Sequence, residues 1–234
     1  MKNLGWRLVS HPCQYIEGRR AAMLVVDPRT AIDSRLYSVL CAQGFRRSGD
    51  IVYRPHCSDC RSCIPVRVDA ESFRPRRNQR RCWARNLDLD ATMSGADYTD
   101  EDHLLMERYL SARHRNAGMD GLGRDELEGF ISSAWSDSRF VRFRLAGRLV
   151  AVMVLDVLDD GLSAVYCFFD PSDDLSRRSL GRYCILWSIN YARRSGLRWL
   201  YLGYYIPECR KMSYKIEYRP QQHLVENEWR YSLF

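Results

Sequence analysis

The hydrophobic and polar positions of the chain indicate a mixed protein that contains both helices and strands. Apolar side chains recur every three or four residues in four segments, the spacing of a helix that buries one face. These predicted helices cover residues 31–43, 100–113, 125–135 and 180–194. Other segments alternate apolar and polar residues, or run apolar between turn residues, as strands do. These predicted strands cover residues 6–9, 21–26, 51–54, 140–145, 149–158, 162–169 and 198–206.

The order of these elements gives an α+β fold class with two parts. The first part is a small α+β unit. In the second part, two helices precede an antiparallel meander, a loop, a helix and a further strand, an order that resembles the GNAT acyltransferase fold. The loop 176–181 lies where that fold has its pyrophosphate-binding turn. It leads into a predicted helix, and backbone N–H groups at a helix N-terminus attract anions. It has one glycine where that fold usually shows two, and an ordinary strand-to-helix connection explains it equally well.

Length and composition exclude several protein classes. The chain has 234 residues, 46% of them hydrophobic, enough for one large domain or two compact ones. No apolar run approaches the roughly 20 residues that span a bilayer, so we expect no membrane protein. The first ten residues lack the long apolar stretch of a signal peptide, so we expect a cytoplasmic protein. In that reducing compartment the nine cysteines are expected not to form a disulfide framework.

Charge is distributed unevenly along the chain. Residues 1–85 hold 17 Lys or Arg and 7 Asp or Glu, whereas residues 86–234 hold 19 and 22. A basic excess confined to one part suggests a surface for a polyanion, most often nucleic acid. The change of sign also marks the expected domain boundary, which gives an N-terminal domain of residues 1–90 and a C-terminal domain of residues 91–234.

The densest basic run covers residues 73–85 and surrounds Trp83 with arginines. These are Arg74, Arg76, Arg77, Arg80, Arg81 and Arg85. Interleaved arginine and aromatic side chains are typical of nucleic-acid binding, and a solvated linker is the plainer interpretation.

Three cysteines follow one another at three-residue intervals. They are Cys57, Cys60 and Cys63, with Cys13 as a fourth candidate and His56 as a substitute for it. This spacing lets thiolates converge on one ion, either tetrahedral zinc or an iron–sulfur cluster. A redox-sensitive thiol cluster without metal is the alternative.

Motifs in both parts resemble the arginyl-tRNA-protein transferase family. In the first part they are His11–Tyr15, Gly44–Gly49, Tyr53–Cys57, Cys63–Pro65 and Asn78–Arg81. In the second they are Leu200–Ile206, Lys211–Lys215 and Tyr218–Pro220. The resemblance spans nearly the whole chain. One departure follows Tyr205, where the family more often has Trp and a serine-containing turn, and this leaves the shape of that turn open.

The short chain resembles the bacterial branch of this family, which implies an activity and its partners. Members of that branch move leucine from leucyl-tRNA to proteins that begin with Asp or Glu, which marks them for degradation by the N-end rule pathway. The implied partners are leucyl-tRNA and acidic protein N-termini, with no DNA and no membrane, and transfer needs no cofactor. Arginyl-tRNA as the donor and an acetyl-CoA-dependent GNAT N-acetyltransferase are the alternatives.

The chemistry of this transfer suggests which residues react. Aminoacyl-tRNA is an activated ester and a protein α-amino group has a pKa of about 7.7 to 8.0, so a strong dedicated base is not compulsory. Lysine can neutralise phosphate or a developing oxyanion, and tyrosine can donate to the leaving oxygen or stack on an adenine. The candidates for the reacting region are Lys211, Tyr214, Lys215, Tyr201 and Tyr204.

Acidic N-termini also need a cation in their pocket, because a buried carboxylate without a partner is costly. The candidates for holding either that carboxylate or tRNA phosphate are Arg46, Arg47, Gln79, Arg80, Arg81 and Arg85. The sequence does not separate these two roles.

Overall fold

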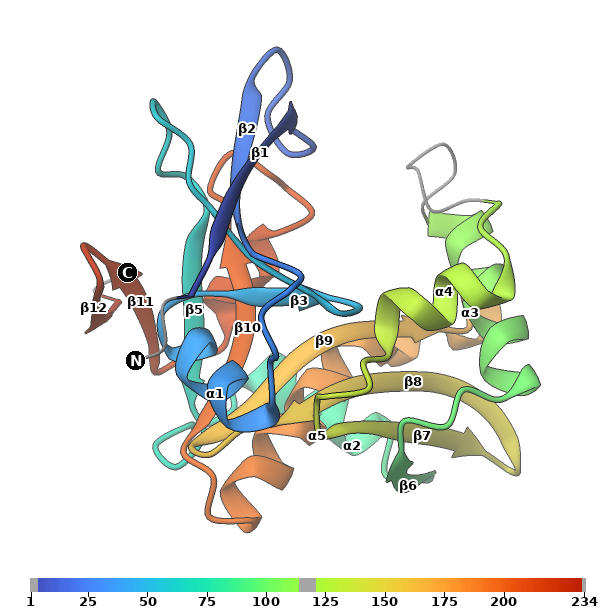
Figure 1. Cartoon of the computed structure of the whole chain (residues 1–234). Coiled ribbons are helices and arrows are strands. Elements are labelled where there is room, and N and C mark those ends of the chain that lie inside the picture. Colours follow the sequence, from blue (N-terminus) through green and yellow to red (C-terminus); the bar gives the residue numbers. More distant parts are fainter. Residues whose placement is uncertain (1–3, 114–120, 233–234) are drawn as a thin grey trace.

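Two β-sheets carry the fold in the computed structural model, which describes residues 4–113 and 121–232 (Figure 1). The small sheet has the strand order β1-β2-β4-β3 and the large sheet the order β12-β11-β5-β10-β9-β8-β7-β6. The small-sheet strands are β1 (Trp6–Pro12), β2 (Arg20–Val26), β3 (Arg46–Ser48) and β4 (Ile51–Pro55). The large-sheet strands are β5 (Ile64–Asp69), β6 (Leu89–Gly95), β7 (Ser138–Leu145), β8 (Arg148–Val157), β9 (Gly161–Phe169), β10 (Trp199–Tyr205), β11 (Gln221–Val225) and β12 (Glu228–Tyr231). The mixed α+β class predicted from the sequence is confirmed.

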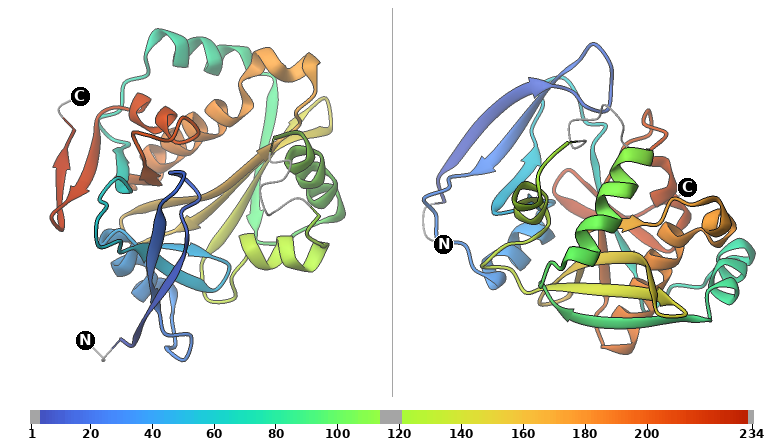
Figure 2. Two further views of the ribbon diagram at one scale, coloured as in Figure 1. Left: turned by 90° about the horizontal axis from the view of Figure 1, so that it is seen from above. Right: turned by 90° about the vertical axis from the view of Figure 1, so that its right-hand side faces the viewer.

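Helices cover both faces of the large sheet. They are α1 (Ser34–Ala42), α2 (Arg77–Arg85), α3 (Asp100–Arg113), α4 (Arg124–Ile131) and α5 (Leu180–Arg194), with short 3-10 helices η1 (Asp173–Arg178) and η2 (Ser213–Glu217). Helices α2 and α5 lie on one side of the large sheet, and the small sheet and α1 lie on the other (Figure 2). One side of the molecule is therefore formed by helices α2 and α5, and the other includes the small sheet and α1.

Strand β8 shows why the large sheet needs cover on both faces. Its side chains alternate between two hydrophobic cores, because successive residues of a strand point to opposite faces. Met153 and Leu155 pack in the core that contains α5, whereas Val152 and Val154 pack in the core that contains α3 and α4. The continuous apolar run in the sequence is the signature of this double burial.

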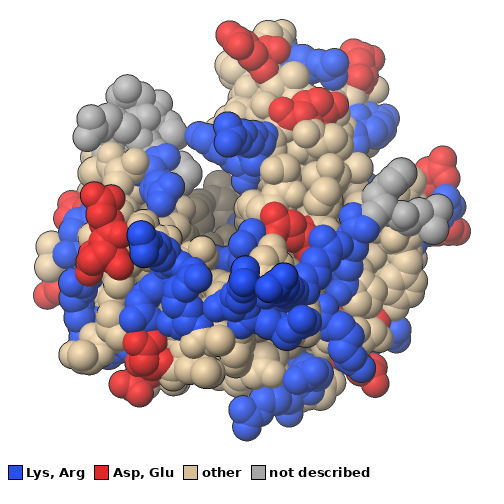
Figure 3. All heavy atoms as spheres, turned by 180° about the vertical axis from the view of Figure 1, so that it is seen from behind, with Lys and Arg blue, Asp and Glu red and all other residues tan. Residues whose placement is uncertain are grey.

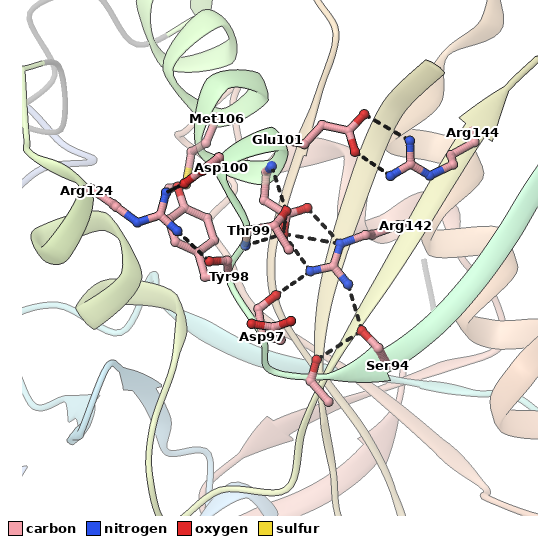
Figure 4. Close-up of polar contacts among 12 residues, drawn as sticks. Ser94, Asp97, Tyr98, Thr99, Asp100, Glu101, Met106, Arg124, Arg142 and Arg144 are labelled. Carbon is pink, nitrogen blue, oxygen red and sulfur yellow. Dashed lines mark hydrogen bonds and ion pairs between the residues drawn. The ribbon is translucent and has the colours of Figure 1, made fainter. Parts of the chain in front are cut away.

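Ion pairs fix the first turn of α3 to strand β7 (Figure 4). The buried Asp102 carboxylate accepts from Nε of Arg142 at 2.9 Å and also from its Nη2. Glu101 pairs in the same way with Arg144 on the same strand. Thr99 accepts from the backbone N–H of Asp102, which completes the helix start. These contacts tie the start of α3 to strand β7.

Strand β5 lies in the middle of the large sheet although it comes early in the chain. It pairs antiparallel with β10 on one side and with β11 on the other. Helix α2 follows β5 and packs against α5. The domain boundary near residue 90 stays a prediction, and the hydrogen-bonded sheet continues across it.

Candidate active site

Strands β9 and β10 run parallel and then separate, and this separation, the strand split, defines the candidate site. The two strands pair over only three residues, from Trp199 opposite Gly161 to Tyr201 opposite Ser163. Beyond that point β10 stays with β5 while β9 stays with β8. Main-chain groups on the facing edges of the two strands therefore need other partners.

Arg46 on β3 supplies donors at the point where the strands part. Its guanidinium donates to Ser163 Oγ at 2.8 Å, to the Ala164 carbonyl, and to the Tyr201 carbonyl at 3.5 Å. These three acceptors come from both β9 and β10, so Arg46 bridges the two strands at the base of the split.

Lys215 on η2 lies next to this guanidinium. The residue is 6% exposed, and its Nζ donates to the Tyr204 carbonyl of β10 at 2.7 Å. Burial, together with the neighbouring charge of Arg46, lowers the pKa of Lys215 to about 7. A large share of Lys215 is therefore neutral near pH 7, and in that form its amine can accept a proton.

Gly203 is the residue that lets the two cations approach. It follows the register shift in β10 and has a φ of 78°, a conformation that glycine adopts without strain. A Cβ at this position would lie 3.3 Å from Nε of Arg46 and 3.7 Å from Nζ of Lys215. The two side chains thus meet over a backbone that carries no side chain.

Within residues 4–113 and 121–232, neither Arg46 nor Lys215 is paired with a carboxylate of the protein. A buried cation without a counter-charge is costly, and a carboxylate ligand would relieve that cost. The strand split is therefore suited to an anionic substrate group.

The other residues predicted to react are placed differently. Tyr214 lies beside Lys215, with Nζ 5.9 Å from its ring centroid, and it is 41% exposed. Lys211 is exposed in the turn before η2. The Tyr201 hydroxyl donates to Asp160, and the Tyr204 hydroxyl donates to the Gly44 carbonyl at 2.9 Å. Both of these tyrosines offer only main-chain carbonyls to the site cations.

Arg47 does not face the site. Its guanidinium and the Asp156 carboxylate are both fully buried and form a two-point pair, with 2.7 Å for each contact. The same group also donates to Ser138 and to the Ile131 carbonyl. These contacts occupy the guanidinium, so we interpret Arg47 as a structural residue rather than a ligand of substrate or tRNA.

The four candidates on α2 lie on the opposite side of the large sheet. Gln79 is buried, accepts from the Arg76 backbone N–H and donates to the Glu217 carbonyl, so it is a structural link. Arg80, Arg81 and Arg85 are exposed. Figure 3 shows a broad band of basic side chains on this side of the molecule, which we call the basic face. The structure thus separates Arg46 from the arginines of α2.

Two features of the site were not found in the sequence. Gly203 interrupts an apolar strand, a signal that marks a bulge or a close approach of backbone. Arg67 lies between two indole rings, with its Cζ 3.8 Å from the centroid of Trp199 and 4.3 Å from that of Trp229. It also donates to the Tyr201 hydroxyl at 3.0 Å, which fixes the start of β10. No local sequence signal points to this stacking.

The four candidate metal-ligating cysteines lie around one small cavity of about 20 Å³. Cys13 follows β1, whereas Cys57, Cys60 and Cys63 lie between β4 and β5. Cys57 Sγ accepts from the Ala22 N–H, and Cys13 Sγ accepts from the Ile16 N–H. Over the described ranges no group of three or more His, Cys, Asp or Glu side chains is arranged to hold a metal ion. Metal binding by these cysteines therefore stays a prediction from their spacing.

Comparison with known proteins identifies the family. The family model described as arginine-tRNA-protein transferase, N terminus, matches residues 11–81, and the model for the C terminus matches residues 101–225. The chain is 46% identical to the aspartate/glutamate leucyltransferase of Hahella chejuensis, over 94% of the chain and 93% of that relative. It is 47% identical to the same enzyme of Thiobacillus denitrificans, over 94% of the chain and 90% of that relative. The solved structure of FemX is 9% identical with a TM-score of 0.45, over 85% of this chain and 79% of that one. No described helix is long and apolar enough to cross a membrane. The chain belongs to the arginine-tRNA-protein transferase family.

Proposed function

We propose that this protein transfers leucine from leucyl-tRNA to the α-amino group of proteins that begin with Asp or Glu. Family membership supports tRNA-dependent aminoacyl transfer, and the names of relatives that match nearly the whole chain support leucine as the donor and Asp or Glu as the acceptor. Within the N-end rule pathway such a transfer converts an acidic N-terminus into a degradation signal, and we place the protein in the cytoplasm on this basis.

The observation that carries the proposal is the contact at the strand split between Arg46, a permanent cation, and Lys215, an amine with its pKa lowered to about 7. Both side chains lie against Gly203, and neither has a carboxylate partner in the described part of the chain. The side-chain carboxylate of an N-terminal Asp or Glu pairs with the Arg46 guanidinium and leaves Lys215 free to move a proton. An N-terminal Ala does not, and this difference provides the basis for choosing acidic acceptors.

The reaction at this site is aminolysis of an ester. The neutral α-amino nitrogen attacks the leucyl carbonyl carbon, a C–N bond forms, and the bond between that carbon and the terminal ribose oxygen breaks. The amine loses a proton, and the departing ribose oxygen gains one. A protein α-amino group has a pKa of about 7.7 to 8.0, so a usable fraction is neutral at pH 7. Holding amine and ester together supplies much of the acceleration.

Lys215 is placed to assist this proton transfer. Its lowered pKa of about 7 gives both protonation states near neutral pH, as an acid–base group needs. In the protonated form it stabilises the oxyanion that develops on the leucyl carbonyl. Tyr214, which lies next to it and is partly exposed, is a donor to the departing ribose oxygen.

The basic face is the proposed tRNA-binding surface. Exposed arginines of α2 present donors for phosphate, with Arg80, Arg81 and Arg85 among them. Helix α2 is also joined to the site element, because Gln79 donates to the carbonyl of Glu217 on η2 at 3.1 Å. In this arrangement residues 1–90 contribute Arg46 and the α2 arginines, and residues 91–234 contribute Lys215 and the strand split.

We propose in addition that the C-terminal part has a GNAT-like core. The antiparallel strands β7, β8 and β9, then α5, then the parallel strand β10 that splits from β9, support this assignment. It keeps acetyl-CoA-dependent N-acetylation as the alternative to be excluded by experiment.

A single transfer assay tests the proposal. Purified protein is given radiolabelled leucyl-, arginyl- or phenylalanyl-tRNA, or acetyl-CoA without tRNA, with peptides that begin with Asp, Glu, Arg or Ala. The expected result is labelling of Asp and Glu peptides by leucyl-tRNA alone. Transfer of arginine would show that arginyl-tRNA is the donor. Acetylation without tRNA would show that the protein is an acetyl-CoA-dependent acetyltransferase. No transfer from any donor would remove the proposal.

The matched variants are Arg46→Gln and Arg54→Gln. Arg54 lies on β4 with its guanidinium over the Phe45 ring, 5.0 Å from the centroid. Arg46→Gln is expected to raise KM for Asp peptides and to reduce the preference for Asp over Ala, whereas Arg54→Gln retains both. Equal losses in the two variants would contradict a specific role for Arg46.

A further inference from the structure

A pocket of about 390 Å³ opens between helices α2 and α5, away from the strand split. Trp83 and Phe73 line it on one side and Leu186 and Ile189 on the other. Its volume lies in the range of sites that enclose small molecules, and its walls are mostly apolar as such sites are. Neither the transfer reaction nor the cation pair makes use of it.

The charge around the pocket limits what it accepts. Arg80 and Arg193 lie at its margin, and none of its lining residues is acidic. The two helices that line it carry further exposed arginines, Arg77 and Arg81 on α2 and Arg194 on α5, and Figure 3 shows many basic side chains on this side of the molecule. An apolar, aromatic pocket inside a basic surface matches the two parts of a nucleotide, a flat base and an anionic phosphate.

We infer that the α2–α5 pocket takes one unstacked nucleobase of the tRNA, which stacks on Trp83 while flanking phosphates contact Arg80 and Arg193. The inference rests on the proposed function, because the donor supplies the RNA. Trp83 is held for this role by Tyr183, whose ring centroid lies 5.4 Å from its own. Asn190 lines the same pocket and carries an amide, which can pair with a base edge as both donor and acceptor.

Stacking and phosphate contact leave different signatures in solution. Phosphate contacts release counterions, so their loss reduces the salt dependence of binding. A stacked base releases none. Loss of one stacking contact lowers affinity by about 5- to 150-fold, the ratio that corresponds to about 1 to 3 kcal/mol, while the salt slope stays the same.

The test measures binding of deacylated tRNA and of heparin, a polyanion without bases, to the full-length protein over a series of salt concentrations. Trp83→Leu removes the flat ring and keeps apolar bulk, and Asn190→Phe fills the pocket without changing charge. Trp187→Leu is the control, because Trp187 stacks on Tyr191 of α5 and does not line the pocket. Thermal unfolding confirms that each variant is folded.

Both pocket variants are expected to bind tRNA about 5- to 150-fold more weakly, with an unchanged salt slope and unchanged heparin binding. The Trp187→Leu control is expected to bind tRNA and heparin as the unmodified protein does. Unchanged tRNA binding in both pocket variants overturns the inference. An equal loss of heparin affinity overturns it as well, because heparin has no bases. A loss of affinity for the acceptor peptide alone also overturns it, because that result assigns the pocket to a protein segment. Leucyl transfer by the unmodified protein tests the proposed function separately, since the pocket is judged by binding alone.

Discussion

Arg46 and Lys215 come from opposite ends of the chain and meet over Gly203. The Cβ that Gly203 lacks would be 3.3 Å from Nε of one and 3.7 Å from Nζ of the other. Strand β10 thus brings two cations together by having a glycine with a positive φ at the strand split. Because a Cβ at Gly203 would lie against both side chains, adding a single methyl group there tests their placement.

Gly203→Ala is expected to lower kcat/KM by about 10- to 100-fold, because the new methyl group displaces one or both cations from their positions. It also costs about 1 to 2 kcal/mol of stability, since φ of 78° strains a residue with a side chain. Steady-state transfer and urea unfolding measure the two effects. Gly196→Ala is the control, because its φ of 71° gives the same strain but nothing lies within 4 Å of its Cβ position. Equal activity in the two variants would contradict the role of Gly203.

The lowered pKa of Lys215 predicts a pH dependence of stability. In the unfolded chain the lysine has its ordinary pKa of 10.5, and in the folded protein about 7. Between these values the unfolded state binds more protons, so the free energy of unfolding rises with pH across this window. Burial and Arg46 cause the lowering, while Cys209 and Cys63 oppose it. The expected contribution of Lys215 is therefore a rise in stability from about pH 7 to about pH 10.5.

Lys215→Met is expected to remove this rise and to be more stable than the parent at neutral pH by roughly 2 to 4 kcal/mol. The variant should also have little transferase activity. Urea unfolding of both proteins at several pH values isolates the lysine, because every other titrating group is shared. Parallel pH profiles for the two proteins would show that Lys215 keeps its ordinary pKa.

The buried pair of Arg47 and Asp156 predicts a purely structural defect. Arg47→Met is expected to cost about 3 to 5 kcal/mol, because it leaves the Asp156 carboxylate buried without a partner. The double variant Arg47→Met and Asp156→Leu should recover most of that loss. Arg230→Met is the surface control, since its pair with Glu228 is exposed and screened by solvent, so its loss should change stability little. Lower tRNA affinity of the folded Arg47→Met protein would instead show that Arg47 takes part in tRNA binding.

The arginines of α2 predict a change in the salt dependence of tRNA binding. Arg81→Ala is expected to reduce the slope of log affinity against log salt by about 1, the value for one lost phosphate contact. Reversing the charge of both Arg80 and Arg81 should weaken binding further. Arg35→Ala on α1 is the control, because α1 lies on the other side of the large sheet. Unchanged tRNA affinity with lost discrimination between Asp and Ala peptides would assign Arg80 and Arg81 to the acceptor instead.

The sequence predicted the elements whose local pattern is strong. Strand β8 has a continuous apolar run because both of its faces are buried, and α5 has a full helical stripe. Strands β5, β6, β11 and β12 were not predicted, because β5 and β6 pair with distant segments of the chain and β6, β11 and β12 lie at or near the edges of the large sheet. The helix predicted over residues 125–135 ends at Ile131, since the next residue is already extended. Local periodicity therefore predicted the covered core but not the strands that complete the sheet.

The site was predictable as a set of residues but not as a geometry. Resemblance to the family selected both Arg46 and Arg47, yet neighbouring strand residues point to opposite faces. Which of the two faces the strand split depends on how β3 pairs with β4 and where the small sheet packs. Likewise Lys215 and Lys211 belong to one motif, and only the η2 turn determines that Lys215 is buried and Lys211 exposed.

The four cysteines around the small cavity give the last prediction. From their spacing we expect protein purified without oxygen to carry zinc or an iron–sulfur cluster. One ion would join the loop after β1 to the loop before β5, so a chelator should lower the unfolding temperature. Metal analysis and the visible spectrum identify the ion, with Cys167→Ser as the control because Cys167 lies on β9, outside the cavity. Metal-free, fully reduced thiols in anaerobic protein would instead show a cluster of free thiols.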